Sequence, residues 1–369
     1  MSKVIFSTAA YEYNRLKPII FQMIDTIGPG LITNNMRVLI KPNLLSPAKP
    51  ERAIVTHPLV VRIVAEYVIA KGGQPVVSDS PPMGSFSKTL NVGEYDKAFR
   101  GLDVPFKPFE TSVPVNIGEP FGHIELAEDA LEADLVINLA KLKTHSQMLL
   151  TLGVKNLFGC IVGYKKPEWH LRAGIDRNFF AKLLVQIYRA ISPAITIVDG
   201  ILALEGQGPG RSGTPRPMGV LIGSCNAVEV DRAICHMIDL DPELLPTNRA
   251  ARELGLLKET SLIQGDFNIV NDFAFPDQIP LTFGPKPLEK IMRRHLIQRP
   301  AVEDSRCKHC EDCLKFCPAK AITTEKNRIV FDYDRCIRCY CCLEICPHGA
   351  LRARETLPGK IVRKITSFR

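Results

Sequence analysis

The sequence predicts an α/β protein, in which a large three-layer domain with a mostly parallel sheet precedes a small α+β domain. Short runs rich in valine, isoleucine and leucine alternate with stretches of helical apolar spacing over the first 285 residues. These runs are continuously apolar, which is typical of strands buried on both faces of a parallel sheet. Nine of the 12 cysteines lie after residue 300, where they indicate a separate unit.

Five apolar runs are the predicted strands of the large domain, and three stretches between them are its predicted helices. The helix over Pro58–Ala70 has proline in its first turn and is followed by Gly72-Gly73, a pattern that marks both helix ends. The other helices cover Asn178–Ile191 and Asn226–Ile238. The predicted strands are Val38–Ile40, Pro75–Val77, Leu135–Leu139, Ala194–Val198 and Met218–Ile222.

Polar residues follow four of these runs at their carboxyl ends. In an open parallel sheet, ligands bind in the crevice outside the carboxyl ends of the strands. We therefore expect these residues to share one site, although each alone would equally suit a helix cap or a surface loop. They are Lys41, Asn43, Asp79, Ser80, Lys141, Lys143, His145 and Asp199.

The segment from Lys141 to Asn156 carries most of the positive charge of this predicted site. Its lysines and loop amides suit a carboxylate or a phosphate. We assign His145 as the proton donor because imidazole titrates near neutral pH. Asp79 and Asp199 would orient a lysine, bind a metal or act as a base. The predicted catalytic residues are His145, Lys143, Lys141 and Asp79, and the predicted substrate-binding residues are Lys41, Asn43, Ser80, Lys155, Asn156 and Asp199.

The carboxyl-terminal cysteines form two copies of the motif C-x2-C-x2-C-x3-C-P, 29 residues apart. This spacing is typical of bacterial ferredoxins with two 4Fe-4S clusters, in which the fourth cysteine of each run ligates the other cluster. Structural zinc is a poorer match because its sites pair two C-x2-C knuckles, and neighbouring motif cysteines are badly placed for disulfides. The predicted ligands are Cys307, Cys310, Cys313 and Cys346 for cluster 1, and Cys336, Cys339, Cys342 and Cys317 for cluster 2.

The cysteine motif divides the chain into four predicted parts. Residues 1–285 form the α/β domain, residues 286–304 a linker, residues 305–352 the two-cluster domain and residues 353–369 a basic tail. The linker includes a short basic, helix-like run and a polar connector from Arg299 to Ser305. The tail is either solvated or a docking patch for an acidic redox partner or for the main domain.

The remaining cysteines are expected to be spectators. Cys341 lies inside the second motif but off its spacing. Cys160, Cys225 and Cys235 lie in apolar stretches, which favour buried and inert thiols. Because the cysteines show no disulfide pattern, they indicate a reducing compartment.

Several other classes of protein fit the sequence poorly. The net charge of +8 over 369 residues does not indicate a nucleic-acid partner, and neither a membrane span nor a signal peptide is visible. We therefore expect a cytoplasmic protein of an anaerobic pathway. Gly208–Gly213 matches G-x-G-x-x-G, but Pro209 and Thr214–Pro217 forbid the helix that a nicotinamide motif must open. That segment is predicted to be a loop, and a candidate lid that begins at Glu205.

Several of these motifs resemble the uncharacterised family DUF362, members of which are often fused to a carboxyl-terminal two-cluster ferredoxin. The resemblance covers most of residues 1–285 and implies no single reaction. The stretch from Lys143 to Asn156 is also similar to one in the lactate racemase family, but this sequence has too few of that family's other histidines for its nickel chemistry. The motifs that resemble DUF362 are Lys41–Asn43, Asp79–Pro81, Lys141–His145, Gly153–Asn156 and Asp199-Gly200.

Three functions compete on these grounds. The first is an iron–sulfur oxidoreductase that passes low-potential electrons through two 4Fe-4S clusters to a small anionic organic substrate in the α/β cleft, with a ferredoxin or flavoprotein as redox partner. Because clusters transfer single electrons, a flavin or another mediator is left open as a further cofactor. The second function is a non-catalytic electron-transfer protein or subunit. The third is a non-redox enzyme on an organic acid, with structural or sensory clusters.

Overall fold

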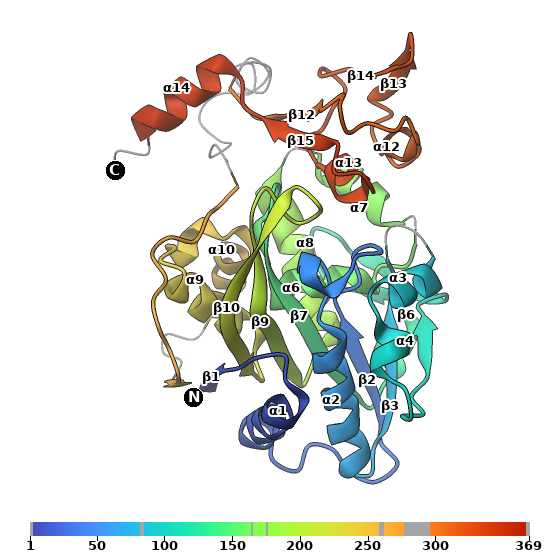
Figure 1. Ribbon diagram of the computed structural model, residues 1–369, viewed down its shortest axis with the longest axis vertical. Coiled ribbons are helices and arrows are strands. Elements are labelled where there is room, and N and C mark those ends of the chain that lie inside the picture. The colour runs from blue at the N-terminus through green and yellow to red at the C-terminus, as the bar shows by residue number, and fades with distance from the viewer. Residues whose placement is uncertain are drawn as a thin grey trace.

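The computed structural model describes residues 3–81, 85–163, 165–174, 176–257, 262–276 and 296–366, with the backbone alone for 362–366. A nine-stranded sheet forms the centre of the large domain, in the order β11-β1-β10-β9-β7-β2-β3-β4 with β8 paired to β7 (Figure 1). Its strands are β1 (Lys3–Thr8), β2 (Arg37–Pro42), β3 (Gln74–Asp79), β4 (Phe106–Pro108), β7 (Leu135–His145), β8 (Leu149–Thr151), β9 (Ile195–Gly206), β10 (Gly213–Ser224) and β11 (Leu262–Gly265).

The predicted mostly parallel sheet is confirmed. β4, β3, β2, β7 and β9 are successive parallel neighbours. The run Met218–Ile222, predicted as another parallel strand, instead lies in β10, which is antiparallel to both β9 and β1. The physical reason is the short connection from β9 to β10, because a parallel pair requires a long crossover and a hairpin does not.

Helices cover both faces of the sheet and complete the three layers (Figure 1). Neighbouring residues of β2 show why the predicted strands are continuously apolar: Ile40 packs in the core under α1 (Tyr13–Ile27) and α2 (Pro58–Ala70), whereas Leu39 packs in the core under α8 (Arg177–Ile191). A third core lies under α9 (Ala227–Met237). The predicted helices at 58–70, 178–191 and 226–238 correspond to α2, α8 and α9.

Shorter elements complete the large domain. The β5 (Ser112–Asn116) and β6 (His123–Ala127) strands form a separate hairpin. The other helices are α3 (Phe86–Val92), α4 (Tyr95–Ala98), α5 (Glu128–Glu132), α6 (Gly153–Asn156), α7 (Lys165–Ala173) and α10 (Pro246–Glu253), with 3-10 turns η1 (Pro50–Arg52), η2 (Leu157–Cys160) and η3 (Pro242–Leu244).

The cysteine-rich segment folds into a small unit of two antiparallel strand pairs and two short helices. β12 (Arg299–Val302) pairs with β15 (Leu351–Arg354), and β13 (Ile322–Glu325) pairs with β14 (Arg328–Phe331). The helices α12 (Asp312–Lys315) and α13 (Cys341–Ile345) follow the second cysteine of each motif, and α14 (Leu357–Thr366) forms most of the predicted tail.

One boundary prediction changes with this arrangement. The polar connector predicted from Arg299 supplies β12, because its backbone pairs with the strand that follows the last motif cysteine. Most of the predicted basic tail forms the helix α14, on which Leu357 and Ile361 are exposed. Residues 286–295 of the predicted linker lie outside the described residues.

The small unit packs over the carboxyl ends of the central strands, with α13 next to α7 (Figure 1). Contacts between described residues of the two parts include a hydrogen bond and a histidine–carboxylate pair. The Ser212 hydroxyl donates to the Leu351 carbonyl at 3.1 Å, and His145 Nε2 lies 2.8 Å from Glu344 Oε1 on α13. The loop Gly208–Gly213 therefore contacts the small unit, and no helix follows it, as predicted from its prolines.

Candidate functional site

A cavity lies between the carboxyl ends of β2, β3 and β7 and the helix α13. It encloses about 810 Å³ of space, part of it open to solvent, and its walls are mainly apolar. Most of the polar strand ends predicted to share a site do meet here. Those that line the cavity are Asn43, Asp79, Ser80, Lys143, His145, Lys155 and Asn156.

Three predicted site residues do not line the cavity: Lys41, Lys141 and Asp199. Lys141 Nζ instead donates to Asp199 Oδ2 at 2.7 Å, and both side chains are buried. Tyr11 and the backbone of His57 also donate to this carboxylate. Burial acts to raise the pKa of Asp199, but the Lys141 charge and these hydrogen bonds outweigh it, so the pKa is lowered. The pair therefore joins strands β7 and β9 to the segment before α1 and to the N-cap of α2, and its hydrogen-bonding groups are occupied within the protein.

Lys41 and Asp79 form a second buried ion pair, at 2.9 Å. Asp79 also accepts the backbone N–H groups of Leu44 and Ser80, so its oxygens are occupied and it is poorly placed to act as a base. Gly159 closes over the pair, because a Cβ at this position would lie 2.3 Å from Asp79 Oδ1 and 2.5 Å from Lys41 Nζ. The absence of a side chain at Gly159 thus allows the backbone to approach the ion pair closely.

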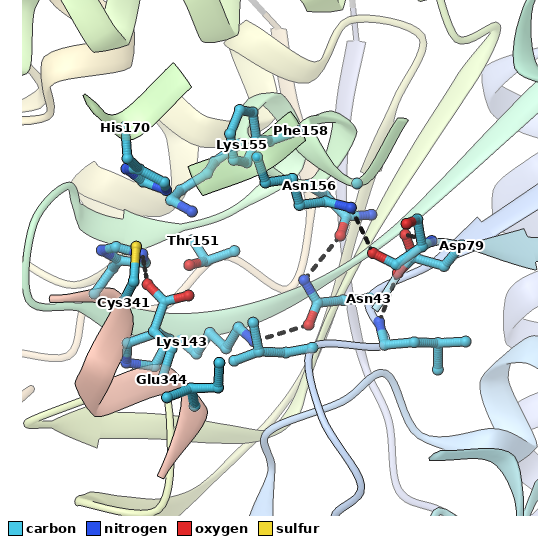
Figure 2. A pocket seen from close by; sticks show the side chains of 18 of the residues that line it. Asn43, Asp79, Lys143, Thr151, Lys155, Asn156, Phe158, His170, Cys341 and Glu344 are labelled. Carbon is cyan, nitrogen blue, oxygen red and sulfur yellow. Dashed lines mark hydrogen bonds and ion pairs between the residues drawn. The ribbon is translucent and has the colours of Figure 1, made fainter. Parts of the chain in front are cut away.

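Among the predicted site residues, Lys143 is the best suited to transfer a proton. Its ammonium group donates to Asn43 Oδ1 and to the Ile54 carbonyl, both at 2.8 Å, and neither acceptor carries a charge. Asn43 in turn donates to Asn156 Oδ1 at 2.9 Å, a chain visible in Figure 2. Burial lowers the pKa of Lys143 to about 7. The group can therefore gain or lose a proton near neutral pH.

His145 has a different role from the predicted proton donor. Its Nδ1 accepts the backbone N–H groups of Gln147 at 3.0 Å and Met148 at 3.1 Å. The ring proton therefore lies on Nε2, which faces Glu344. Burial and Lys155 lower the pKa of His145 to about 4. A neutral imidazole in this arrangement orients the helix α13 and has no second proton to give.

Several cavity residues were missed from the sequence. Lys166 and His170 lie on α7 four residues apart, a helical spacing that places both on one face and could have been recognised. Glu344 and Cys341 come from α13 and meet the large domain only through the tertiary fold. Cys341 is thus not a distant spectator but a wall of the cavity, where Figure 2 shows it beside Glu344.

One of the three predicted buried thiols is exposed. Cys160 and Cys235 are buried, whereas Cys225 is exposed. It lies in the turn between Ser224, the last residue of β10, and Asn226, which caps α9. A turn at this point leaves the thiol at the surface despite the apolar residues before it.

Two smaller cavities in the small unit are surrounded by cysteines of both motifs. Cys307, Cys310, Cys313 and Cys346 line one of about 360 Å³, and Cys317, Cys336, Cys339 and Cys342 line the other, of about 320 Å³. Backbone N–H groups also reach the sulfurs, from Ala321 to Cys317 at 3.2 Å and from Ala350 to Cys346 at 3.3 Å.

These thiols surround volumes rather than single points. Within the described ranges, no three His, Cys, Asp or Glu side chains converge as the ligands of a lone metal ion would. A cubane, which spreads its four thiolates around a larger inorganic core, fits the donor set and the space.

Two family models match separate parts of the chain. The chain belongs to the family of the domain of unknown function DUF362, whose model matches residues 38–236, and a 4Fe-4S dicluster domain matches residues 299–347. It is therefore a DUF362 protein with an iron–sulfur unit. A thylakoid-associated protein of Synechocystis sp. is 35% identical over 303 residues, which cover 80% of this chain and 94% of that protein.

Solved structures are similar only at a distance. The lactate racemase apoprotein from Thermoanaerobacterium thermosaccharolyticum is 11% identical, with a TM-score of 0.38, over 62% of this chain and 55% of that one. A protein from Thermotoga maritima is 10% identical, with a TM-score of 0.37, over 87% of this chain and 86% of that one. None of the described helices combines the length and apolarity of a membrane span.

Proposed function

We propose that the protein is an iron–sulfur oxidoreductase that delivers electrons to a small organic anion bound in the cavity. The observation that carries this proposal is the composition of the cavity wall. Lys143, Lys155 and Lys166 of the large domain face Cys341 and Glu344 of α13 across one space. The helix α13 contains the motif cysteine Cys342 and is followed by Cys346, so a ligand in this cavity is next to a cluster-binding segment.

The two cysteine-lined cavities are proposed to hold two 4Fe-4S clusters with the crossed ligation that the sequence predicts. Each cavity combines three cysteines of one motif with the fourth cysteine of the other motif. When bound, the clusters supply electrons one at a time.

The two clusters would differ in accessibility. Cys310, in the first quartet, is exposed, which favours electron uptake from a reduced ferredoxin or flavoprotein. Cys339 and Cys342, in the second quartet, are buried, and Cys341 beside them lines the anion cavity. The first quartet would therefore hold its group on the side open to a donor, and the second quartet would hold its group nearer the cavity.

The reaction requires protons as well as electrons. Two electrons from the reduced protein donor, delivered singly, and two protons convert an activated C=C or C=O bond to its CH–CH or CH–OH product. Lys143 is the proposed donor of one proton, because it lines the cavity and its pKa of about 7 leaves it partly charged at neutral pH. Solvent would supply the second proton and recharge the lysine.

A flavin or another two-electron mediator in the same cavity is the main variation on this scheme. The alternative of a non-catalytic electron-transfer subunit has a supporting observation in the exposed Cys310 and the neighbouring basic residues Lys308 and Arg306. A cytoplasmic location stays a prediction, and the name of the Synechocystis relative associates that protein with thylakoids.

Anaerobic reduction of the purified holoprotein tests the proposal. The protein is reduced with dithionite, excess reductant is removed, and small conjugated carboxylic acids are added while the cluster absorbance is followed. We expect at least one acid to reoxidise the wild type and to be recovered with two more hydrogens, and Lys143→Met to slow this step. Reduced protein that is stable against every acid, with no bound flavin, would favour the electron-transfer subunit.

A further inference from the structure

Three polar groups that line the cavity lack partners. The hydroxyl Oγ1 of Thr151 and Nδ1 of His170 are buried without a hydrogen bond among the described residues. Lys155 Nζ likewise makes neither a hydrogen bond nor an ion pair within the described part of the chain. Because a buried polar atom left unpaired costs about 1–3 kcal/mol, the two buried atoms of Thr151 and His170 beside this lysine indicate a ligand.

These three groups come from separate elements, and two of them contact one aromatic ring. Thr151 ends β8, Lys155 lies on α6 and His170 on α7. Lys155 Nζ is 5.8 Å from the centroid of the Phe158 ring, and the His170 ring is 5.4 Å from it. Figure 2 shows all three on the side of the cavity that faces Cys341 and Glu344.

The charges of this group match a monoanion. Lys155 supplies one positive charge. Burial lowers the pKa of His170 to about 3, so its ring is neutral and offers one N–H. The Thr151 hydroxyl offers another neutral donor. One cation and two neutral donors suit the two oxygens of a carboxylate.

The rest of the cavity determines the body of the ligand. Its walls include Phe158, Phe316 and Ile345, with further apolar surface from leucine and proline side chains. These walls suit a flat apolar group better than a sugar or a polyol, which would leave hydroxyl groups unpaired.

We infer that Thr151, Lys155 and His170 form a carboxylate subsite, and that the cavity takes a conjugated carboxylic acid whose flat body lies against Phe158. This inference rests on the proposed function, because a conjugated body is what an electron from the neighbouring cluster can reduce. It adds Thr151 and His170 as positioning residues, neither of which is required for the cluster unit to form.

Equilibrium binding to the oxidised holoprotein tests the subsite without any electron transfer. The probe is benzoate, measured by calorimetry under anaerobic conditions, with benzyl alcohol and phenyl phosphate as comparisons. We expect Thr151→Val to weaken benzoate binding about tenfold or more, the loss expected for a hydrogen bond to a charged group. Thr151→Ser, which keeps the hydroxyl, should bind within about twofold of the wild type.

The control is Lys182→Met, which removes a lysine paired with Glu253 away from the cavity and should bind benzoate as the wild type does. Wild-type protein that does not bind benzoate, or equal binding by the valine variant, would overturn the subsite. Tighter binding of phenyl phosphate than benzoate would also overturn it. Benzoate binding that depends on Thr151, in a protein that reduces no acid, would keep the subsite and reject the proposed function.

Discussion

Replacement of Lys143 by methionine is the perturbation whose result the structure defines best. The wild-type ammonium group is buried, with two uncharged acceptors and no carboxylate in contact. The charged groups that face it are Glu344 and Asp79, which raise its pKa, and Lys155 and Lys141, which lower it; burial outweighs them all and brings the pKa to about 7. Methionine keeps most of the side-chain volume and removes the charge.

Two magnitudes follow from that pKa. A fall from 10.5 to about 7 corresponds to roughly 5 kcal/mol of cost for keeping the charge in the folded protein below pH 7. Because the unfolded chain binds the extra proton between about pH 7 and 10.5, wild-type stability should rise over that window, and Lys143→Met should remove this rise. The variant should therefore fold normally despite the loss of two hydrogen bonds.

Anion binding should show the opposite dependence on pH. An anion in the cavity favours the charged lysine, so benzoate affinity should be constant below about pH 7 and fall toward tenfold per unit above it. At pH 8, binding should take up about 0.9 proton more in the wild type than in Lys143→Met, since a group with a pKa of about 7 is mostly neutral there. Calorimetry in buffers of different ionisation enthalpy measures this difference. Equal proton uptake by the two proteins would refute the assignment.

Three other predictions concern the cysteines and the buried pair. Cys310→Ser should lower the iron content of anaerobically purified protein well below that of the wild type, whereas Cys341→Ser should leave it unchanged. Iron analysis measures both. An unchanged iron content in Cys310→Ser would contradict the proposed ligand set. Asp199→Asn should lower the unfolding free energy by about 3–5 kcal/mol, because it leaves the Lys141 charge unpaired, as measured by urea denaturation. The same variant should bind benzoate like the wild type. Loss of benzoate binding without loss of stability would show instead that Asp199 belongs to the binding site.

Much of the fold could be predicted because local patterns determine it. Pro58 and the glycines after Ala70 mark the ends of α2, and the continuous apolar run at Val38–Ile40 reflects burial on both faces of the sheet. The antiparallel direction of β10 depends on chain connection rather than on residue pattern, so the run Met218–Ile222 gave no sign of it.

The site was predicted in part for a related reason. Strand ends share one edge of the sheet, so Asn43, Asp79 and Lys143 could be grouped from sequence. The pairing of side chains could not be predicted from sequence. Lys141 of β7 lies beside Asp199 of the neighbouring strand β9 in the observed register, so neither side chain lines the cavity. Glu344 reaches the site from another domain, and no local pattern reveals such a contact.

The central claim is that a ligand in the cavity lies next to a reducible cluster. Electron paramagnetic resonance of the dithionite-reduced protein, recorded with and without saturating benzoate, tests it most directly. The account predicts that benzoate changes the signal of one cluster and leaves the other as it was, and that Thr151→Val needs a higher benzoate concentration for the same change. Spectra that stay identical at saturation, in protein shown by calorimetry to be fully bound, would contradict the claim.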